Sequence, residues 1–382
     1  SVGEPGFCTE SAAQRSTPQS TPQLTMPSSS SSSSMTKPNA AVMPQLSSPP
    51  ADSASIAPEA TQIKAGIPLL NGYEIEIGQV IGSGGFASVY RARWQGTPVA
   101  VKVLSESLGR QNILETKAAK EANLLAQLRH PSICTFYGIC EKEGCNGATC
   151  LVLELMEGGT LAQFVYDEDG TTSKRYGEMM VADKSQGALR LLQLSLQVAD
   201  GLRFLHASGV AHKDIKCSNV LLDVSHSQAK VTDFGLSHIA SGHSLELCQW
   251  AASETEATSN NMSTGSASGF GTVRYAAPEH AEQTATPTEK QRFERDIYSY
   301  GMLLHEVLHG ARTFVDMTPF QAFFGASKGK RPPVDLTGLP EEYGPLANLI
   351  ECCWHHESQE RPSAQQVVDT LLDLLQHVDH AF

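Results

Sequence analysis

Hydrophobic and polar residues alternate in three consecutive segments that begin at residue 73. These segments are YEIEIGQVIGSGG from Tyr73, ASVYRARW from Ala87 and TPVAVKVL from Thr97. Alternation with a period of two residues predicts a strand that buries one of its faces. We therefore predict three successive antiparallel strands, and two further short strands near 135–141 and 150–155.

The spacing of hydrophobic residues changes to a helical period later in the chain. Residues 112–128 carry leucines at helical spacing among charged residues, and Pro131 follows this predicted helix and stops it. A longer amphipathic helix starts at Leu189 and is closed by Gly209. The pattern is that of an α+β protein, in which a small β-rich lobe with one main helix precedes a large α-helical lobe. Further helices are predicted near 293–308, 319–327, 343–353 and 364–377.

Residues 1–70 differ in composition from the rest of the chain. They contain the serine tract Ser28–Ser34 among Pro, Thr, Gln and Ala, with few side chains that could form a core. This composition predicts a disordered Ser/Pro-rich arm. A tether, a phosphorylated tail and a faulty gene-model extension are alternatives, and we favour a tail without catalytic role. Two polar insertions, Tyr166–Gly187 and Ser241–Ser268, are predicted to be mobile surface loops.

Composition and charge narrow the functional classes. The formal net charge of the 382 residues is −13, which argues against a general nucleic-acid binder because such a protein needs a basic face. The nine cysteines are odd in number and irregularly spaced, so we expect reduced thiols in an intracellular, cytoplasmic protein. No run of eighteen apolar residues occurs, and no membrane span is predicted. The chain begins with Ser1 rather than Met, as a fragment of a longer protein would.

Two of the predicted strands carry features suited to phosphate binding. The segment IGSGGFASVY, from Ile81, places glycines in a hairpin whose backbone can close over phosphates and donate N–H groups. A strand follows this hairpin, so it is not a Rossmann fingerprint. Lys102 lies on an apolar strand and must meet an anion or extend to water. We favour Glu121 as its partner, although a solvated Glu121 on its helix also fits the pattern.

The segment AHKDIKCSN, from Ala211 to Asn219, concentrates polar residues immediately before an apolar VLL. Asp214 can accept or orient a hydroxyl proton, and Lys216 can hold a transferring phosphoryl group. Asn219 and Asp233, the latter in TDFG, offer the hard oxygen atoms that suit Mg²⁺. These residue types predict phosphoryl-transfer chemistry.

Residues 73–375 resemble the eukaryotic protein kinase family. The ordered motifs are GSGGFASV, VAVK, Glu121, HKDIKCSN, DFG, AAPE from Ala276, DIYSYG from Asp296 and RPS from Arg361. The resemblance implies a bilobal kinase fold over 71–380, with an N-lobe of about 71–156, a C-lobe of about 157–380 and ATP between them. It also implies Mg²⁺ as a cofactor, protein substrates as partners and self-association for autophosphorylation.

The resemblance also gives each matching position a role. Lys102 would hold the α- and β-phosphates and pair with Glu121, while Asp214 would act as base and Lys216 would neutralise the γ-phosphate. Asn219 and Asp233 would bind Mg²⁺. Backbone groups of the hinge residues Glu154 and Met156 would bond adenine, behind the gatekeeper Leu153. The other nucleotide-binding positions would be Ile81, Gly82, Ser83, Gly84, Gly85, Phe86, Ala87, Ser88, Val89, Ala100 and Leu221. Structural roles would fall to the Glu279–Arg361 ion pair, to Asp296 as brace of the catalytic loop, and to a stack of Leu125, His212 and Phe234.

Substrate specificity follows from smaller features of the resemblance. Serine and threonine kinases carry a lysine where Lys216 stands, and Thr272 is placed to hydrogen-bond Asp214 and Lys216. HPSICTFYGIC, LELMEGGTL and CCW are similar to the tyrosine-kinase-like group, which is mostly Ser/Thr-specific. We therefore predict a serine/threonine kinase, with dual specificity as the alternative.

The chain departs from the family pattern at two positions. Ala87 replaces the third glycine of the hairpin, from which we expect lower nucleotide affinity at most. Lys213 replaces the arginine that precedes the catalytic aspartate, and a lysine lacks the bidentate fork for a phosphorylated loop. Regulation by phosphorylation of the long segment 233–279 is therefore less certain, and Ser263–Ser268 is its best window.

Two other functions compete with that of an active kinase. A pseudokinase scaffold is disfavoured because all six catalytic positions are intact, and a small-molecule kinase is disfavoured by AAPE together with Arg361. ECCWHHE from Glu351, and the evenly spaced Cys140, Cys145 and Cys150, are more typical of structure than of zinc sites. We expect no regulatory domain after the last predicted helix.

Overall fold

A computed structural model describes residues 66–83, 87–104, 119–141, 149–235, 237–239, 273–281, 287–337 and 339–379. All of them belong to the second of two structural units, Ile56–Phe382. The predicted arm up to residue 65, the whole predicted insertion Ser241–Ser268 and its neighbours, and Gly84 to Phe86 lie outside the described residues.

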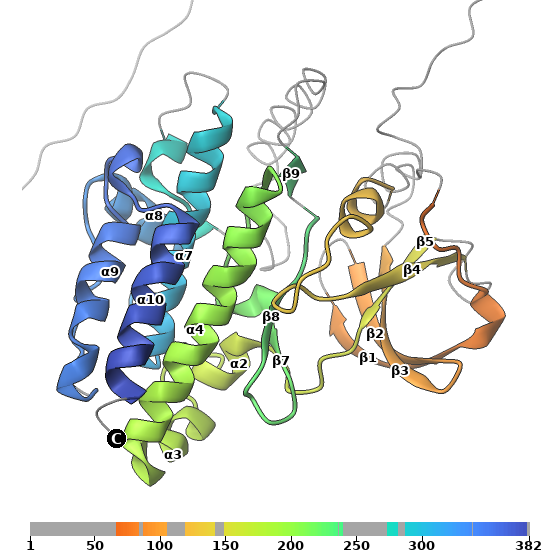
Figure 1. Ribbon diagram of the computed structural model, residues 1–382, viewed down its shortest axis with the longest axis horizontal. Coiled ribbons are helices and arrows are strands. Elements are labelled where there is room, and N and C mark those ends of the chain that lie inside the picture. Colours follow the sequence, from red (N-terminus) through yellow and green to blue (C-terminus); the bar gives the residue numbers. More distant parts are fainter. Residues whose placement is uncertain are drawn as a thin grey trace, which may run out of the picture. The chain divides into compact units, whose positions relative to one another are not determined.

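The strand-rich part of the chain forms an antiparallel sheet (Figure 1). Ala100 and Lys102 lie in the middle of β3, opposite Leu153 and Leu151 of β5. The three predicted consecutive strands and the two later ones are confirmed. In spatial order the five strands of this sheet, within the described residues, are β1 (Ile75–Ser83), β2 (Ala87–Trp94), β3 (Thr97–Leu104), β5 (Thr149–Glu154) and β4 (Phe136–Glu141).

Residues 119–125 are helical and pack against this sheet. Ala122, Leu124 and Leu125 are buried in the same hydrophobic core as Phe136 and Leu151. The predicted helix 112–128 is confirmed where it is described, except that its helical turns end at residue 125 and residues 112–118 lie outside the described residues. This packing fixes the position of Glu121 beside β3.

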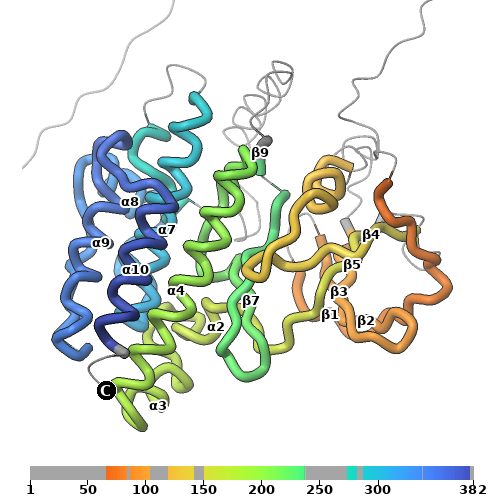
Figure 2. Tube along the Cα trace, viewed as in Figure 1, coloured from red at the N-terminus to blue at the C-terminus, as the bar shows by residue number. Residues whose placement is uncertain are grey.

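The remainder of the described chain is mainly helical, and α4 (Lys184–Ala207) lies at its centre, against α3, α7 and α10 (Figure 2). Its buried face includes Leu191, Val198 and Leu202. The helix begins five residues before the predicted Leu189, because Asp183 accepts a hydrogen bond from the Gln186 N–H and caps it. The other helices of this part are α2 (Leu161–Val165), α3 (Lys174–Ala182), α7 (Glu289–His309), α8 (Pro319–Ser327), α9 (Pro345–Cys353) and α10 (Ala364–Asp379).

The prediction of a mobile loop over Tyr166–Gly187 is wrong. This segment contains α3 and the first turn of α4. Ser173 caps α3 by accepting a hydrogen bond from the Tyr176 N–H, and the buried Tyr176 hydroxyl donates to the Leu308 carbonyl at 3.1 Å. Tyr176 is therefore the buried anchor of a helix whose other residues are exposed or partly exposed, which is why its sequence shows no clear periodicity.

Short strands and 3-10 turns carry the segments between the long helices. The pair β7 (Val220–Leu222) and β8 (Ala229–Val231) brings Asn219 and Asp233 to the same end of one ribbon. The other short elements are β6 (Val210–Ala211), which pairs with β9 (His238–Ile239), and the turns η2 (Gly72–Glu74), η4 (Cys217–Asn219), η5 (Pro278–Ala281), η6 (Glu341–Tyr343) and η7 (Ser358–Glu360).

Candidate active site

Lys102, on β3, contacts two carboxylates, one on the helix 119–125 and one in the segment that follows β8. Its Nζ lies 2.8 Å from Glu121 Oε1 and 2.9 Å from Asp233 Oδ1, and both Lys102 and Glu121 are nearly buried. Burial lowers the pKa of Lys102, but the attraction of Glu121 and Asp233 outweighs this and raises the pKa above its ordinary value. Lys102 is therefore a fixed cation, and the predicted ion pair with Glu121 is present.

Asp214 is held in place by two neighbours from its own loop. Lys216 Nζ lies 2.8 Å from Asp214 Oδ2, and Asn219 Nδ2 donates to the same oxygen at 2.9 Å and to the Asp214 carbonyl at 2.8 Å. The turn η4 folds the chain back after Lys216, which brings Asn219 beside Asp214. The segment AHKDIKCSN thus brings the side chains of Lys216 and Asn219 to the carboxylate of Asp214.

Asp296, on α7, anchors the backbone of the segment that carries Asp214. Its carboxylate accepts hydrogen bonds from the N–H groups of His212 at 2.8 Å and Lys213 at 2.7 Å, and from His206 Nε2 at 3.0 Å. Lys213 has φ = +68°, a conformation that is unfavourable for residues other than glycine. The buried Asp296 stabilises this strained turn, as its predicted role as a brace requires.

Asp233 also has a left-handed backbone, with φ = +65°. This conformation directs its carboxylate to Lys102 while Phe234 is buried behind it. The Phe234 ring lies 5.0 Å from the ring of His212, and Leu125 belongs to the same buried core. The predicted stack of Leu125, His212 and Phe234 therefore lies within one core, and the contact between its two rings is present.

Four of the predicted adenine positions, Ile81, Val89, Ala100 and Leu153, lie on the five-stranded sheet, and Leu221 lies on β7. Ala100 and Leu153 are buried, Val89 and Leu221 are half-buried, and Ile81 is 45% exposed. Gly82 pairs with Val89, and Ser83 pairs with Ser88, at the open end of the β1–β2 hairpin. Glu154 and Met156 follow directly at the end of β5. Gly84, Gly85 and Phe86, like Thr272, lie outside the described residues.

An ion pair that was not predicted from the sequence joins the hinge to the strand that leads to Asp233. Lys230 Nζ donates to both carboxylate oxygens of Glu154 at 2.8 Å, and the Thr135 N–H donates to Glu154 Oε2 at 3.1 Å. Burial raises the pKa of Glu154, but these hydrogen bonds outweigh it and lower the pKa. The sequence feature that could have predicted this pair is Lys230 in the buried strand AKV. A buried lysine needs an anion nearby, as Lys102 does.

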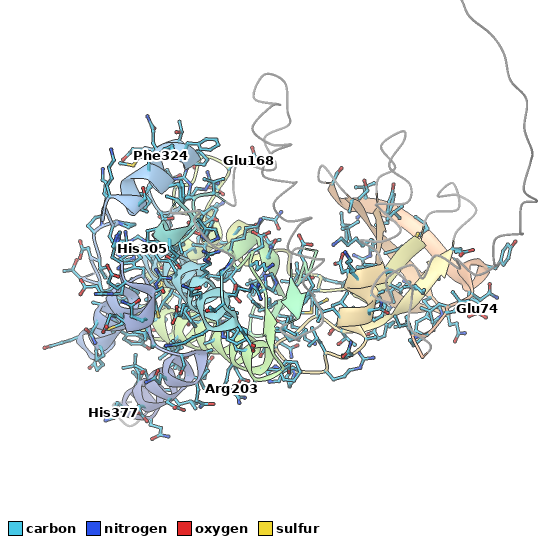
Figure 3. The ribbon with its side chains drawn as sticks, turned by 90° about the horizontal axis from the view of Figure 1, so that it is seen from above. Glu74, Glu168, Arg203, His305, Phe324 and His377 are labelled. Carbon is cyan, nitrogen blue, oxygen red and sulfur yellow. The ribbon has the colours of Figure 1, made fainter. Side chains whose placement is uncertain are left out.

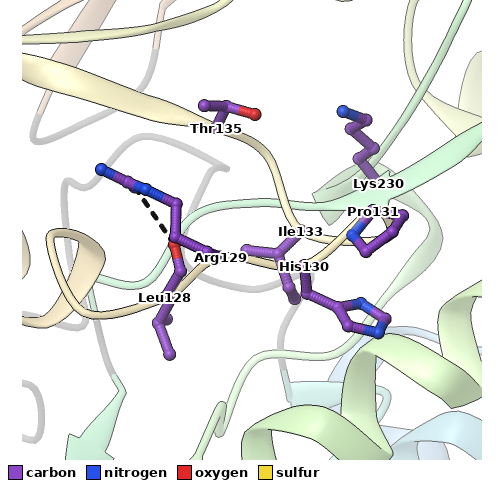
Figure 4. Close-up of a pocket in the computed structure, with 7 residues that line it drawn as sticks. All are labelled: Leu128, Arg129, His130, Pro131, Ile133, Thr135 and Lys230. Atoms are coloured by element: carbon purple, nitrogen blue, oxygen red, sulfur yellow. Dashed lines mark hydrogen bonds between the residues drawn. The ribbon is translucent and has the colours of Figure 1, made fainter.

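A cavity of about 320 Å³ lies beside this ion pair, and Figure 4 shows Arg129 and Lys230 at its two ends. His130 Nε2 lies 3.3 Å from Asp200 Oδ2 and its ring stacks on Phe204, so α4 holds this residue. The cavity is lined by Leu128, Arg129, His130, Pro131, Ile133, Thr135 and Lys230.

Arg361 and Glu279 form the predicted buried ion pair. Two hydrogen bonds of 2.8 Å join the guanidinium to the carboxylate, and the arginine side chain is fully buried. Arg361 also donates to the carbonyls of Glu294 and His355 and lies over the ring of Tyr298. The pair ties the segment after residue 273 to α7 and to the chain before α10.

The protein oxygen atoms near Asp214 suit a magnesium ion that keeps water and phosphate ligands better than a metal ion enclosed by protein ligands alone. Both hydrogen bonds of the Asn219 amide group use its Nδ2, so Oδ1 is the atom suited to a metal, and the Asp233 side chain is 48% exposed. Two protein oxygens suit Mg²⁺, which takes its other ligands from water and phosphates. Within the described ranges no group of three or more His, Cys, Asp or Glu side chains could hold a metal ion.

Comparison with known proteins identifies the family. A family model described as "Protein tyrosine and serine/threonine kinase" matches residues 75–371, and the chain belongs to this family. The strand-rich N-lobe and helical C-lobe thus form the bilobal α+β kinase fold. Among the described residues, no helix is both long and apolar enough to span a membrane.

Curated relatives differ in their names and in their lengths. A putative serine/threonine-protein kinase/receptor of Acanthamoeba polyphaga mimivirus is 30% identical over 79% of this chain and 16% of the relative. The serine/threonine-protein kinase STY46 of Arabidopsis thaliana is 27% identical over 81% and 46%, respectively. The dual specificity protein kinase splA of Dictyostelium discoideum is 29% identical over 79% and 11%. The chain thus spans less than half the length of each of these relatives.

Proposed function

We propose that this chain is a protein serine/threonine kinase that transfers the γ-phosphate of ATP to Ser and Thr hydroxyls of protein substrates. The observation that carries the proposal is Lys102, whose Nζ contacts Glu121 at 2.8 Å and Asp233 at 2.9 Å. This arrangement places a fixed cation between the two lobes, beside a carboxylate that suits a metal. We assign the kinase domain to residues 71–380, with the lobes meeting near 156–157.

The proposed mechanism uses the residues around Asp214. Asp214 orients the acceptor hydroxyl and takes its proton, and Lys216, 2.8 Å from Asp214 Oδ2, stabilises charge on the transferring phosphoryl group. Lys102 binds the α- and β-phosphates. Asn219 and Asp233 would hold Mg²⁺, which would supply positive charge beside the phosphates. Most of the rate enhancement then comes from positioning and electrostatic stabilisation.

Nucleotide binding is assigned to the hairpin, the sheet and the hinge. The backbone of Gly82 to Val89 closes over the phosphates, and the backbone groups of Glu154 and Met156 bond adenine. Ala100 and Leu221 belong to the apolar walls on opposite sides of the ring, and Leu153 limits the depth of the site. The buried state of Ala100 and Leu153 supports this assignment.

Serine/threonine specificity rests on Lys216 and on relatives that bear this name, among them STY46 of Arabidopsis thaliana. Dual specificity is the second candidate, because splA of Dictyostelium discoideum is named a dual specificity kinase. We also propose an intracellular, cytoplasmic location, which the free thiols of the described cysteines support.

The test is phosphate transfer by the purified full chain from radiolabelled ATP and Mg²⁺ to itself and to a generic basic protein, followed by phosphoamino-acid analysis. Asp214→Asn is the matched variant, since asparagine keeps an oxygen for Lys216 and Asn219. We expect phosphoserine or phosphothreonine, and a loss of about 10²–10⁴-fold in Asp214→Asn with ATP binding retained. Phosphotyrosine alongside them would indicate dual specificity. ATP binding without transfer, also after pre-phosphorylation, would favour a pseudokinase scaffold.

A further inference from the structure

Arg91 lies on the face of the sheet to which the nucleotide is assigned. It pairs with Ala100 across β2 and β3, and Ala100 pairs with Leu153 across β3 and β5. Directly paired residues of an antiparallel sheet point to the same face, so these three side chains form one row. Val89, two residues before Arg91 on β2, points to that face as well. Arg91 therefore shares its face with the apolar wall of the proposed nucleotide site.

Glu157 follows the hinge, and backbone hydrogen bonds attach its segment to β7. The Gly158 N–H donates to the Leu222 carbonyl at 2.9 Å, and the Leu222 N–H donates to the Gly159 carbonyl at 2.9 Å. Leu222 lies on β7 together with Leu221, which is assigned to the wall on the other side of the adenine ring. The position of Glu157 is therefore set by the strand that carries this second wall.

An ion pair joins these two positions. Arg91 Nη2 donates to Glu157 Oε1, although the two residues are 66 apart in the sequence. The two side chains are 47% and 37% exposed, so the pair lies at the surface rather than in a core. Because water screens an exposed pair, it contributes little to the stability of the fold. Its main consequence is geometric, since it connects the strand of one wall to the segment that is tied to the other.

We propose that Arg91 is a positioning residue for ATP, which acts through Glu157 to set the separation of the two walls that enclose the adenine ring. The proposal rests on the proposed kinase function. A bound nucleotide leaves when the walls separate, and the ion pair opposes movement of β2 away from residues 157–159. Loss of the pair should therefore speed nucleotide dissociation. Neither side chain takes part in the chemical step, so its loss should not lower kcat.

The central test compares Arg91→Met with Arg93→Met in the full chain. Arg93 lies on the same strand and face, and its Nη1 donates to the Gly96 carbonyl at 3.0 Å, so its removal changes the charge of this face equally. Dissociation of a fluorescent ADP analogue bound with Mg²⁺ is followed after mixing with excess ATP. We expect Arg91→Met to raise the dissociation rate and the KM for ATP about two- to fivefold, and Arg93→Met to leave both within about 1.5-fold. Equal values for the two variants would overturn the proposal.

Charge reversal distinguishes the ion pair from a merely structural role of either residue. Arg91→Glu places two carboxylates against each other, so it should weaken nucleotide binding more than Arg91→Met does. A double variant with Arg91→Glu and Glu157→Arg restores an opposite pair and should recover most of the affinity of the wild type. Arg93→Glu controls for the added negative charge on this face of the sheet. Failure of the double variant to recover affinity would contradict the proposal.

Salt concentration gives a further readout that a structural role would not change. Dissolved ions screen an exposed ion pair, so the advantage of the wild type should decline with salt. The ratio of the dissociation rates of Arg91→Met and wild type should fall toward one between about 0.05 and 1 M KCl. A ratio that stays constant over this range would overturn the role of the pair.

The same measurements separate this proposal from the kinase function. A wild-type chain that binds the ADP analogue but transfers no phosphate refutes the kinase function, and the dissociation rates still decide the role of Arg91. A chain that transfers phosphate while Arg91→Met leaves dissociation unchanged refutes only the positioning role. A wild-type chain that binds no nucleotide would overturn both.

Discussion

The Arg361 guanidinium donates two parallel hydrogen bonds to the Glu279 carboxylate, from Nη1 to Oε1 and from Nη2 to Oε2, each 2.8 Å long. The arginine side chain is fully buried, and that of Glu279 is 19% exposed. The pair lowers the pKa of Glu279, although burial acts to raise it. Removal of one partner of a buried pair leaves the other charge without compensation.

We therefore predict that Arg361→Met lowers the free energy of unfolding by about 3–5 kcal/mol. Arg361→Lys keeps the charge but loses the fork, and should fall between wild type and Arg361→Met. Urea unfolding followed by tryptophan fluorescence provides the measurement. As a control, Arg203→Met removes the part-exposed pair with Asp200 and should change stability by about 0–1 kcal/mol. An equal effect of the two methionine variants would contradict this prediction.

Asp296→Asn tests the brace beneath the catalytic loop. Asparagine can accept from only one of the two N–H groups of His212 and Lys213, because its amide nitrogen meets the other donor. Lys213 is then free to leave its left-handed conformation. We expect a loss of about 1–3 kcal/mol in stability and a fall in kcat that exceeds the change in ATP affinity. Phosphate transfer and calorimetric melting would be measured beside Asp200→Asn, which lies on α4 and should leave both unchanged.

His305 predicts a pH dependence of stability. Its ring is buried, stacks on His309 with centroids 3.8 Å apart, and donates from Nε2 to the Pro333 carbonyl at 3.0 Å (Figure 3 labels His305). Burial, with His309 adding to it, lowers the pKa of His305 to about 4 from 6.5. The unfolded chain therefore binds a proton below about pH 6.5 that the folded chain accepts only near pH 4. The stabilisation is complete above pH 6.5 and is lost as the pH falls from 6.5 toward 4.

Titration of His305 changes the free energy of unfolding by at most about 1.4 kcal/mol per pH unit. His305→Gln keeps a donor for Pro333 but does not titrate, so its melting temperature should fall less than that of wild type between pH 6.5 and pH 4. The exposed His377, on α10, provides the control as His377→Gln. A wild-type and a His305→Gln protein with parallel pH profiles would refute the assignment.

Gly158 lies where the hinge passes β7, and a side chain does not fit there. A Cβ atom at this position would meet the Asp223 carbonyl oxygen at 2.0 Å. We predict that Gly158→Ala destabilises the fold by about 1–3 kcal/mol and weakens ATP binding through displacement of the hinge. At Gly177, inside α3, an added Cβ atom would meet nothing within 4 Å beyond its chain neighbours and the nearby backbone of its own helix, so Gly177→Ala should stabilise by about 0.5–1 kcal/mol. Denaturation midpoints measure the stability of both variants, and nucleotide titration measures ATP binding. A stability change of the same sign in Gly158→Ala and Gly177→Ala would contradict the prediction.

The order of the elements and much of the candidate site could be predicted from the amino-acid sequence alone. Period-two alternation located the strands that carry Lys102, and helical periodicity located the helix with Glu121. Burial of a charge on an apolar strand requires an opposite charge, so the Lys102–Glu121 pair could be predicted from chemistry and order along the chain. The motif resemblance added the Glu279–Arg361 pair.

Which distant groups share an environment depends on the tertiary packing and could not be predicted from the sequence. Glu154 and Lys230 are 76 residues apart, and nothing in either local pattern selects this partner among the other acidic residues. The helix α3 depends on the burial of Tyr176, which its local sequence pattern does not reveal. The carboxylate of Glu306, buried on α7, accepts hydrogen bonds from Tyr275 and Thr313 because the fold brings their segments to one buried point. Hydrophobic periodicity records which face of an element is buried, but the partner of a buried polar group depends on how the elements pack in space.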